Sequence, residues 1–225
     1  MENSKILTGD IYMTFLKIKR VIYLISKRIC DILISLIGLI LLIPVTLLVK
    51  IAYMCTGDFH RIFFVQDRIG KNGKTFKFYK FRSMVVNADE ILFKKLAEDE
   101  KLREEYSMNK KLKNDPRITK VGRMIRNFSI DEMPQFINIF LGDMSLIGNR
   151  PYLPREKKDM GQYYEEIIKT KPGLTGYWQV SGRSSLSFQK RLELESYYSN
   201  HSGFKIDIKI FFKTFKVVLF GKDAQ

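Results

Sequence analysis

Two adjacent carboxylates, Asp131 and Glu132, are the residues of this chain best suited to chemistry. They stand in the segment SIDEMPQ, shortly before Pro134. Proline has no N–H and fits the first turn of a helix, where amide donors have no partner within the helix. The sequence therefore predicts a helix that begins close to Asp131, with both carboxylates facing its positive end.

Basic residues surround this acidic pair and indicate what it could act on. They are Arg117, Lys120, Arg123 and Arg126 before the pair, and Arg150 in the tight GNRP loop after it. Cations keep a nearby carboxylate ionised, and they can hold a phosphate group against it. The arrangement suits phosphoryl transfer by covalent catalysis, with a carboxylate as the nucleophile.

A structural role accounts for the same acidic residues. Asp131 can cap the helix, and Ser129 with Glu132 three residues later has the spacing of a capping box. A helix begun at Ser129 would place Pro134 in its interior at a cost of about 3 kcal/mol, which favours Asp131 as the cap. The catalytic and capping interpretations both remain open, and the local sequence by itself favours the cap.

Composition limits the classes of partner. The chain has 225 residues, enough for one domain with appendages. Its 39 basic residues exceed the 24 acidic ones and give a net charge of +15, which indicates nucleic acid, anionic lipid or a phosphorylated substrate as the partner. The cysteines and histidines do not have the spacing of zinc ligands, so no structural metal site is expected.

An uncharged apolar segment, residues 32–49, predicts contact with a membrane. As a straight helix it would be roughly 27 Å long, close to the hydrocarbon thickness of a bilayer. Both flanks are basic, which conflicts with a single crossing, and Pro44 favours a break inside the segment. A re-entrant hairpin and a single kinked span remain open, and we expect the hairpin.

Four other segments have recognisable patterns. Residues 11–28 mix apolar and basic side chains and predict an interfacial helix. Residues 61–84 predict a β-hairpin with an Asn-Gly turn, whose second strand presents Lys80 and Arg82 on one face. Residues 87–113 predict a surface helix or insertion, and residues 203–222 a cationic amphipathic helix.

Taken in order, these segments resemble the bacterial sugar transferase family, the monotopic phosphoglycosyl transferases that load a sugar phosphate onto a polyprenyl carrier. The resemblance runs from about residue 27 to the C-terminus. It is carried by the Pro44 segment and by QDRIGKNGKTFKFYKFRSM, DPRITKVGRMIR, SIDEMPQ, GDMSLIGNRP, KPGLTGYWQVSGR and FKIDIKIFFKT.

The resemblance implies an α+β, predominantly helical fold with a re-entrant membrane helix, amphipathic interfacial helices and a small β-hairpin. We expect three parts: a basic amphipathic arm over residues 1–28, the membrane helix over 29–52, and a cytosolic transferase domain over 53–225. Such a protein would lie in the bacterial inner membrane, on its cytoplasmic face and among anionic phospholipids.

The resemblance also implies a reaction. Asp131 would attack the sugar-bearing phosphorus of a UDP-sugar, UMP would leave, and undecaprenyl phosphate would take the phosphosugar. Glu132, with Asp131, would bind Mg²⁺. The cations expected to contact the substrate or its phosphates are Lys80, Arg126, Arg150 and Arg183.

Two positions depart from the family pattern. Asn149 stands where proline is usual, in a loop associated with nucleotide recognition, and Glu195 stands where aspartate is common. Neither belongs to the acidic pair, so activity is expected to be retained. A membrane-attached scaffold that binds without turnover is the main alternative, and a nucleic-acid binder is disfavoured by the apolar segment.

Overall fold

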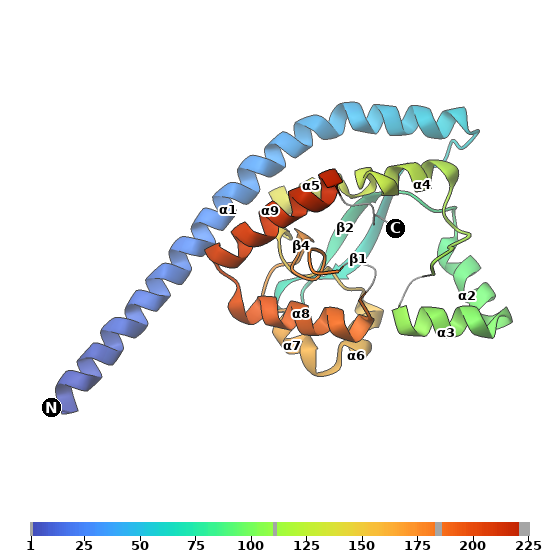
Figure 1. Ribbon diagram of the computed structural model, residues 1–225. Coiled ribbons are helices and arrows are strands. Elements are labelled where there is room, and N and C mark those ends of the chain that lie inside the picture. Colours follow the sequence, from blue (N-terminus) through green and yellow to red (C-terminus); the bar gives the residue numbers. More distant parts are fainter. Residues whose placement is uncertain (1, 110–111, 183–185, 221–225) are drawn as a thin grey trace.

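The computed structural model describes residues 2–109, 112–182 and 186–220, and it is predominantly helical, as predicted (Figure 1). The longer helices are α1 (Glu2–Cys55), α2 (Ala88–Glu98), α3 (Glu100–Asn109), α4 (Lys120–Asn127), α5 (Gln135–Leu141), α8 (Phe188–His201) and α9 (Phe204–Phe220). Short helices are α6 (Lys157–Met160), α7 (Tyr164–Ile167), and the 3-10 turns η1 (Lys71–Gly73), η2 (Ile130–Glu132), η3 (Pro154–Glu156) and η4 (Gly161–Tyr163). The strands are β1 (Phe63–Ile69), β2 (Thr75–Phe81), β3 (Ser145–Ile147) and β4 (Gly173–Thr175).

Helix α1 is continuous through Pro44, so the predicted break and hairpin are not confirmed. Figure 1 shows a bend instead: the first part of α1 projects away from the domain, and the later part lies along it. Leu42 and Val49 are buried on either side of Pro44, and this burial offsets the hydrogen bond that proline removes. Among the described residues, α1 is the helix long and apolar enough to cross a membrane.

One face of α1 packs against the domain at helical spacing. Its buried residues are Tyr23, Asp31, Ser35, Gly38, Leu42, Val49 and Tyr53. Glycine is required at position 38, since a Cβ there would lie 2.4 Å from the ring of Phe136 in α5. Because of this close approach, α5 packs directly on α1, with the acidic pair just before the start of α5.

The predicted hairpin is confirmed. Strands β1 and β2 pair in antiparallel register, from Phe63 opposite Phe81 to Ile69 opposite Thr75. Asn72 and Gly73 in the turn have φ of 57° and 77°, the left-handed conformation that an Asn-Gly turn uses. The free edge of β2 is closed by Asn138 of α5, whose amide donates to Lys77 O at 2.6 Å and accepts from Tyr79 N at 3.1 Å.

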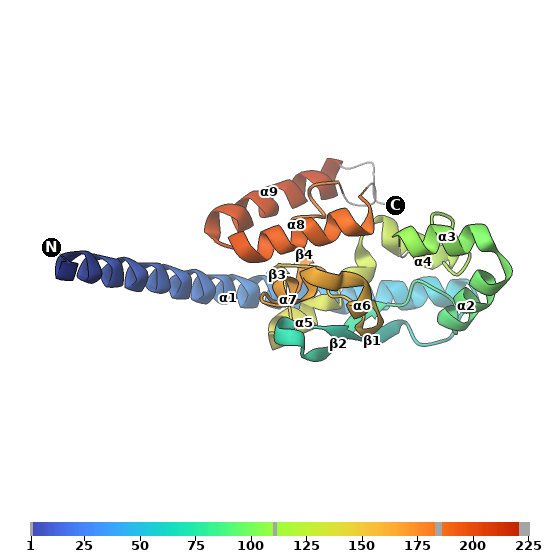
Figure 2. The ribbon, with the colours of Figure 1, turned by 90° about the horizontal axis from the view of Figure 1, so that it is seen from below.

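A second pair of strands, β3 and β4, is parallel. Ser145 of β3 lies opposite Gly173 of β4, and Ile147 opposite Thr175. Helices α8 and α9 lie beside this pair, and in Figure 2 α9 and α5 are on opposite sides of α1. The buried carboxylate of Asp207 in α9 accepts hydrogen bonds from Tyr23 and Lys27 of α1 and from Tyr198 of α8, so it ties three helices together.

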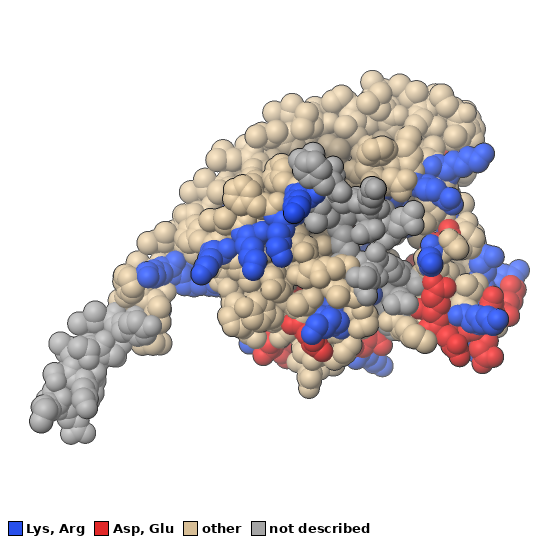
Figure 3. Space-filling view, in the orientation of Figure 1, with Lys and Arg blue, Asp and Glu red and all other residues tan. Residues whose placement is uncertain are grey.

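The amphipathic and surface helices also follow the prediction. Helices α2 and α3 form the predicted insertion at the surface of the domain. Helix α9 buries Asp207 and Ile210 and exposes an apolar row of Phe204, Ile208, Phe211, Phe212 and Phe215. Figure 3 shows basic side chains gathered along α9 and the adjoining part of α1, below an upper outline of α1 that is free of charge on this face.

Candidate active site

The acidic pair lies in η2, immediately before α5. Pro134 is the N-cap residue of α5, so the helix begins close to the predicted position. Asp131 is 6% exposed, whereas Glu132 is partly exposed. The Asp131 carboxylate is therefore shielded from water, and the neighbouring Glu132 carboxylate is more accessible.

The capping interpretation is not supported. Neither η2 nor α5 has a side-chain hydrogen bond at its N-cap, and Ser129 has a left-handed φ of 55°. A capping carboxylate would accept a backbone N–H of the next turn. Asp131 instead approaches a lysine, so its burial needs an explanation other than helix capping.

Lys80 of β2 brings a positive charge to the pair. Its Nζ is 3.0 Å from Glu132 Oε1 and 3.7 Å from Asp131 Oδ2. The side chain is only 25% exposed, which limits screening by water. The hairpin and the Asn138 contact fix β2 against α5, so the packing of α5 on the hairpin determines where this cation lies.

Burial raises the pKa of Asp131 above its ordinary value, an effect that opposes the neighbouring cations predicted from sequence to keep this carboxylate ionised. The charges of Lys80 and Arg126 lower that pKa, and the nearby Glu132 carboxylate raises it. Desolvation is the largest of these effects. Asp131 is therefore a carboxylate in a poorly hydrated place, where it is less stabilised and more nucleophilic than an exposed one.

Arg126 of α4 is held by a residue that sequence analysis missed. Its Nε donates to Ser83 Oγ at 2.8 Å, and its positive charge lowers the pKa of Asp131. Ser83 in turn touches α4 so closely that a Cβ on Gly122 would lie 1.8 Å from its carbonyl oxygen. The SM dipeptide after the hairpin carried no chemical signal, so this role could not be seen from spacing.

Other cations near the pair in sequence lie elsewhere in space. Arg117 is buried against Asp115, with Nη2 2.6 Å from Oδ2, and Lys120 and Arg123 are exposed. Arg82, predicted to share a face with Lys80, donates through Nη2 to both carboxylate oxygens of Asp58 at 2.9 Å. Arg183 lies outside the described residues.

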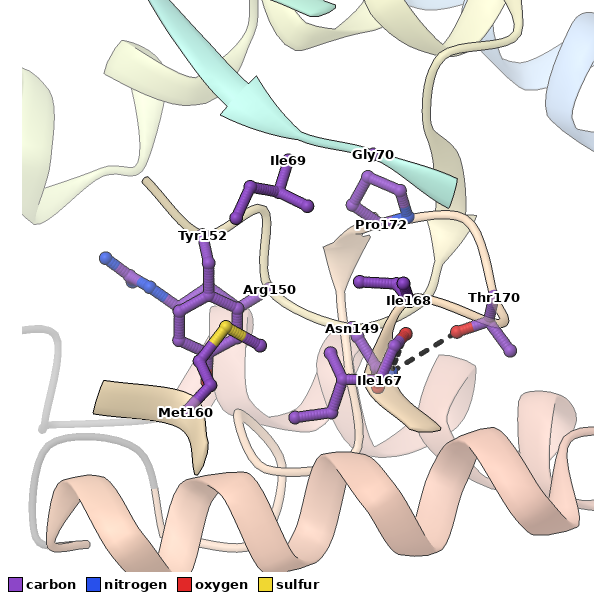
Figure 4. A pocket seen from close by; sticks show the side chains of 10 residues that line it. All are labelled: Ile69, Gly70, Asn149, Arg150, Tyr152, Met160, Ile167, Ile168, Thr170 and Pro172. Carbon is purple, nitrogen blue, oxygen red and sulfur yellow. Dashed lines mark hydrogen bonds between the residues drawn. The ribbon is translucent and has the colours of Figure 1, made fainter. Parts of the chain in front are cut away.

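Arg150 lies in the loop after β3, beside a small hollow (Figure 4). Its backbone N donates to Glu195 Oε1 at 2.8 Å, and its guanidinium is 6.0 Å from the centre of the Tyr152 ring. Glu195 is fully buried, which raises its pKa to about 7. Within the described residues no hydrogen bond or ion pair joins Arg150 to Asp131 or Glu132.

The two departures from the family pattern meet at this loop. The Asn149 amide donates to Ile167 O at 3.1 Å and Thr170 Oγ1 at 3.2 Å, the latter dashed in Figure 4, and to Ser199 Oγ of α8 at 2.6 Å. Glu195 of α8 holds the next residue of the loop. Both positions thus shape the conformation that presents Arg150, and neither contacts the acidic pair.

The acidic pair could hold Mg²⁺ only together with a substrate. In the part of the chain that the structure describes, no three His, Cys, Asp or Glu residues are grouped as a complete metal site. Magnesium commonly binds through one or two carboxylates plus substrate phosphates and water. Asp131 and Glu132 fit that donor set, with Glu132 as the more accessible ligand.

Comparison with known proteins places this site in a family context. The family model described as bacterial sugar transferase matches residues 22–221. An undecaprenyl-phosphate galactose phosphotransferase of Salmonella typhimurium is 44% identical over 193 residues, which cover 86% of this chain and 40% of that protein. The exopolysaccharide production protein ExoY of Sinorhizobium fredii is 39% identical, with 89% of this chain and 88% of that protein covered.

A third relative is a UDP-glucose:undecaprenyl-phosphate glucose-1-phosphate transferase of Klebsiella pneumoniae. It is 34% identical over 203 residues, which cover 86% of this chain and 40% of that protein. The chain thus spans about two fifths of the length of the Salmonella and Klebsiella relatives and most of the length of ExoY.

Proposed function

The chain belongs to the bacterial sugar transferase family, and from that premise we propose that it transfers a sugar-1-phosphate from a UDP-sugar to undecaprenyl phosphate. The product is an undecaprenyl diphosphosugar, UMP is released, and the reaction passes through a phosphosugar bound covalently to Asp131. This would be a first membrane step in bacterial polysaccharide or glycoconjugate assembly. Similarity to undecaprenyl-phosphate sugar phosphotransferases supports the reaction class.

One observation carries the assignment of Asp131. Its carboxylate is buried, caps no helix, and lies 3.7 Å from the Lys80 ammonium. Burying a carboxylate costs free energy unless an ion pair and hydrogen bonds offset that cost, and the raised pKa of Asp131 reflects it. A nucleophile for phosphorus accounts for this arrangement better than a structural acid does.

In the first proposed step, a carboxylate oxygen of Asp131 attacks the sugar-bearing phosphorus. A new oxygen–phosphorus bond forms, the bond from phosphorus to the bridging diphosphate oxygen breaks, and UMP leaves with that electron pair. Lys80 and Arg126 reduce the repulsion between the anionic carboxylate and the anionic diphosphate. The low exposure of Asp131 also keeps water from hydrolysing the intermediate.

In the second step, a phosphate oxygen of undecaprenyl phosphate attacks the same phosphorus. The bond to Asp131 breaks, and the free carboxylate is restored. Mg²⁺, when bound by Glu132 and Asp131, supplies positive charge that offsets the diphosphate. Arg150 and Arg183 are proposed to contact the donor substrate or its phosphates.

The proposal also places the chain in one leaflet of the bacterial inner membrane, on the cytoplasmic side. The later part of α1 packs along the domain from Asp31 to Tyr53, which supports a placement in which this part of the helix stays with the domain at the membrane surface. Its outer face exposes Ile40, Ile43 and Leu47, which suit acyl chains. The lysines of α9 suit anionic phospholipid headgroups.

Cysteine labelling tests this placement. Cysteines introduced at residues 5–20 and 70–80 should react from the same face of sealed membrane vesicles. That result would mean that a bent, continuous α1 keeps both ends of the helix on one side of the membrane, as the predicted hairpin would have done. Labelling of the two groups from opposite faces would establish a crossing helix and end the monotopic proposal.

Product analysis tests the reaction. Wild-type protein in detergent with Mg²⁺ should release UMP from one member of a UDP-sugar panel, and intact-protein mass spectrometry without undecaprenyl phosphate should show a phosphosugar adduct. The panel should include glucose, galactose, N-acetylglucosamine, N-acetylgalactosamine and bacillosamine-type donors. Asp131→Asn should show neither UMP nor adduct, whereas equal UMP release from both proteins would favour the scaffold alternative.

A further inference from the structure

A second group of cations lies at the other end of α5, away from the acidic pair. Arg28 of α1 donates through Nη1 to Ile139 O at 2.7 Å and through Nη2 to Phe140 O at 2.8 Å. The α5 carbonyls are thereby satisfied, and Gly142 ends the helix with a φ of 92°. Arg28 thus stands where α1 enters its apolar segment.

Lys171, in the loop before β4, approaches the same point. A Cβ built on Gly142 would lie 3.3 Å from Arg28 Nη2 and 3.5 Å from Lys171 Nζ. Two cationic nitrogens therefore converge on the open side of a glycine, within reach of a single oxygen atom. A side chain at position 142 would occupy that space.

The charge of Lys171 is not neutralised by a contact. No hydrogen bond or ion pair reaches its ammonium from any residue that the structure describes. Burial lowers the pKa of Lys171, and the neighbouring charges of Arg28 and Lys71 lower it further, while Asp31 and Asp143 raise it. Asp31 already accepts from Ser145 Oγ at 3.0 Å and Leu146 N at 2.8 Å, so it is engaged with β3.

Exposed apolar side chains that adjoin Arg28 and Gly142 in sequence indicate what kind of anion would bind. Leu141 and Phe140 at the end of α5 are 62% and 40% exposed, and Ile29 and Leu33 of α1 are 52% and 57% exposed. They lie close in sequence to the residues that hold the cations. A free phosphate would gain nothing from these groups, whereas a lipid would bury them under its chain.

We propose that Arg28 and Lys171, converging over Gly142, bind the phosphate of a membrane lipid whose chain lies along the exposed apolar side chains of α1 and α5. The site is separate from the acidic pair, because α5 and its Gly142 turn lie between them. It recognises a phosphate group joined to a hydrocarbon chain, which an anionic phospholipid and a polyprenyl phosphate both carry. The proposal does not depend on turnover at Asp131.

Native mass spectrometry of the full chain in detergent tests this site. The probes are dioleoyl phosphatidylglycerol, undecaprenyl phosphate and inorganic phosphate, each titrated against the wild type and Lys171→Gln. Loss of one charge-assisted contact should weaken lipid binding by roughly tenfold. Lys169→Gln is the matched control, because Lys169 is exposed two residues away and should leave lipid binding unchanged.

Two further variants separate lipid from free phosphate and binding from catalysis. Leu141→Ser should weaken lipid binding while leaving any inorganic phosphate binding unaltered, and Asp131→Asn should retain the lipid. The phospholipid and polyprenyl arms identify which headgroup is preferred. Equal lipid binding by Lys171→Gln and Lys169→Gln would overturn the site, and displacement of lipid by millimolar inorganic phosphate would overturn its assignment to lipid.

Discussion

Replacement of Lys80 by glutamine gives the sharpest test of the proposed catalytic arrangement. The change removes the ammonium that lies 3.7 Å from Asp131 and 3.0 Å from Glu132, and it keeps a side chain of similar length. The protein should fold, because the packing of β2 depends on the hairpin register and on Asn138. The effect should therefore appear in catalysis.

The expected size follows from two limits. Unit charges 3.7 Å apart interact by about 4 kcal/mol at an effective permittivity near 20, which is an upper bound. Hydrogen bonds to charged groups contribute about 1.5–3 kcal/mol in mutational series. Since Lys80 would touch the phosphoryl oxygens during transfer, we expect Lys80→Gln to lower kcat by roughly 10- to 150-fold.

The pH dependence gives an independent readout. The Lys80 charge lowers the pKa of Asp131, so its removal should raise that pKa further. The attacking group is the ionised carboxylate, which is protonated as the pH falls. On acidification, Lys80→Gln should therefore lose activity at a higher pH than the wild type. A general loss of stability would not shift the acidic limb of the pH–rate profile in this direction.

Steady-state UMP release measured across pH is the assay, and Lys77→Gln is its matched control. Lys77 lies on the same strand, exposed and paired through its side chain with Asp67 at the surface. That variant should keep the wild-type kcat and acidic limb. A Lys80→Gln enzyme with unchanged kcat and an unshifted limb, or equal losses in both variants, would refute the assigned role of Lys80.

Three other substitutions have defined outcomes. Ser83→Ala removes the acceptor of Arg126 Nε and should reduce kcat roughly tenfold in the UMP assay with little change in melting temperature, whereas a loss of stability without a change in kcat would contradict its positioning role. Gly38→Ala places a methyl group 2.4 Å from Phe136 and should destabilise the chain by about 1–3 kcal/mol in denaturant unfolding, so wild-type stability would contradict the close α1–α5 contact. Asp131→Asn should raise the melting temperature at neutral pH, because it removes a buried charge. A carboxyl group with a raised folded-state pKa stabilises the fold below its unfolded pKa and loses that contribution as pH rises, so the gain over wild type should vanish in acid. A lower melting temperature at neutral pH would contradict the cost assigned to burying this carboxylate.

The local elements follow from the sequence by itself. The Asn-Gly turn of the hairpin, the start of α5 near Pro134 and the cationic pattern of α9 all depend on backbone conformation and side-chain periodicity within a few residues. Such signals are contained in the segment that carries them. The acidic pair is likewise visible in the residue types of one short segment, and the family resemblance in the order of the motifs along the chain.

Only the tertiary structure decided which groups face Asp131 and how much free energy the burial of its carboxylate costs. Lys80 donates a hydrogen bond to Glu132, 52 positions away in sequence. Arg117 is much nearer to Glu132 in sequence but forms an ion pair with Asp115. The same holds for Pro44: a local rule predicts a break, but α1 is continuous and packs one face on the domain through the buried Leu42 and Val49. Partner choice, desolvation and the continuity of α1 through Pro44 depend on free energies summed over distant contacts, and no short segment of sequence contains those contacts.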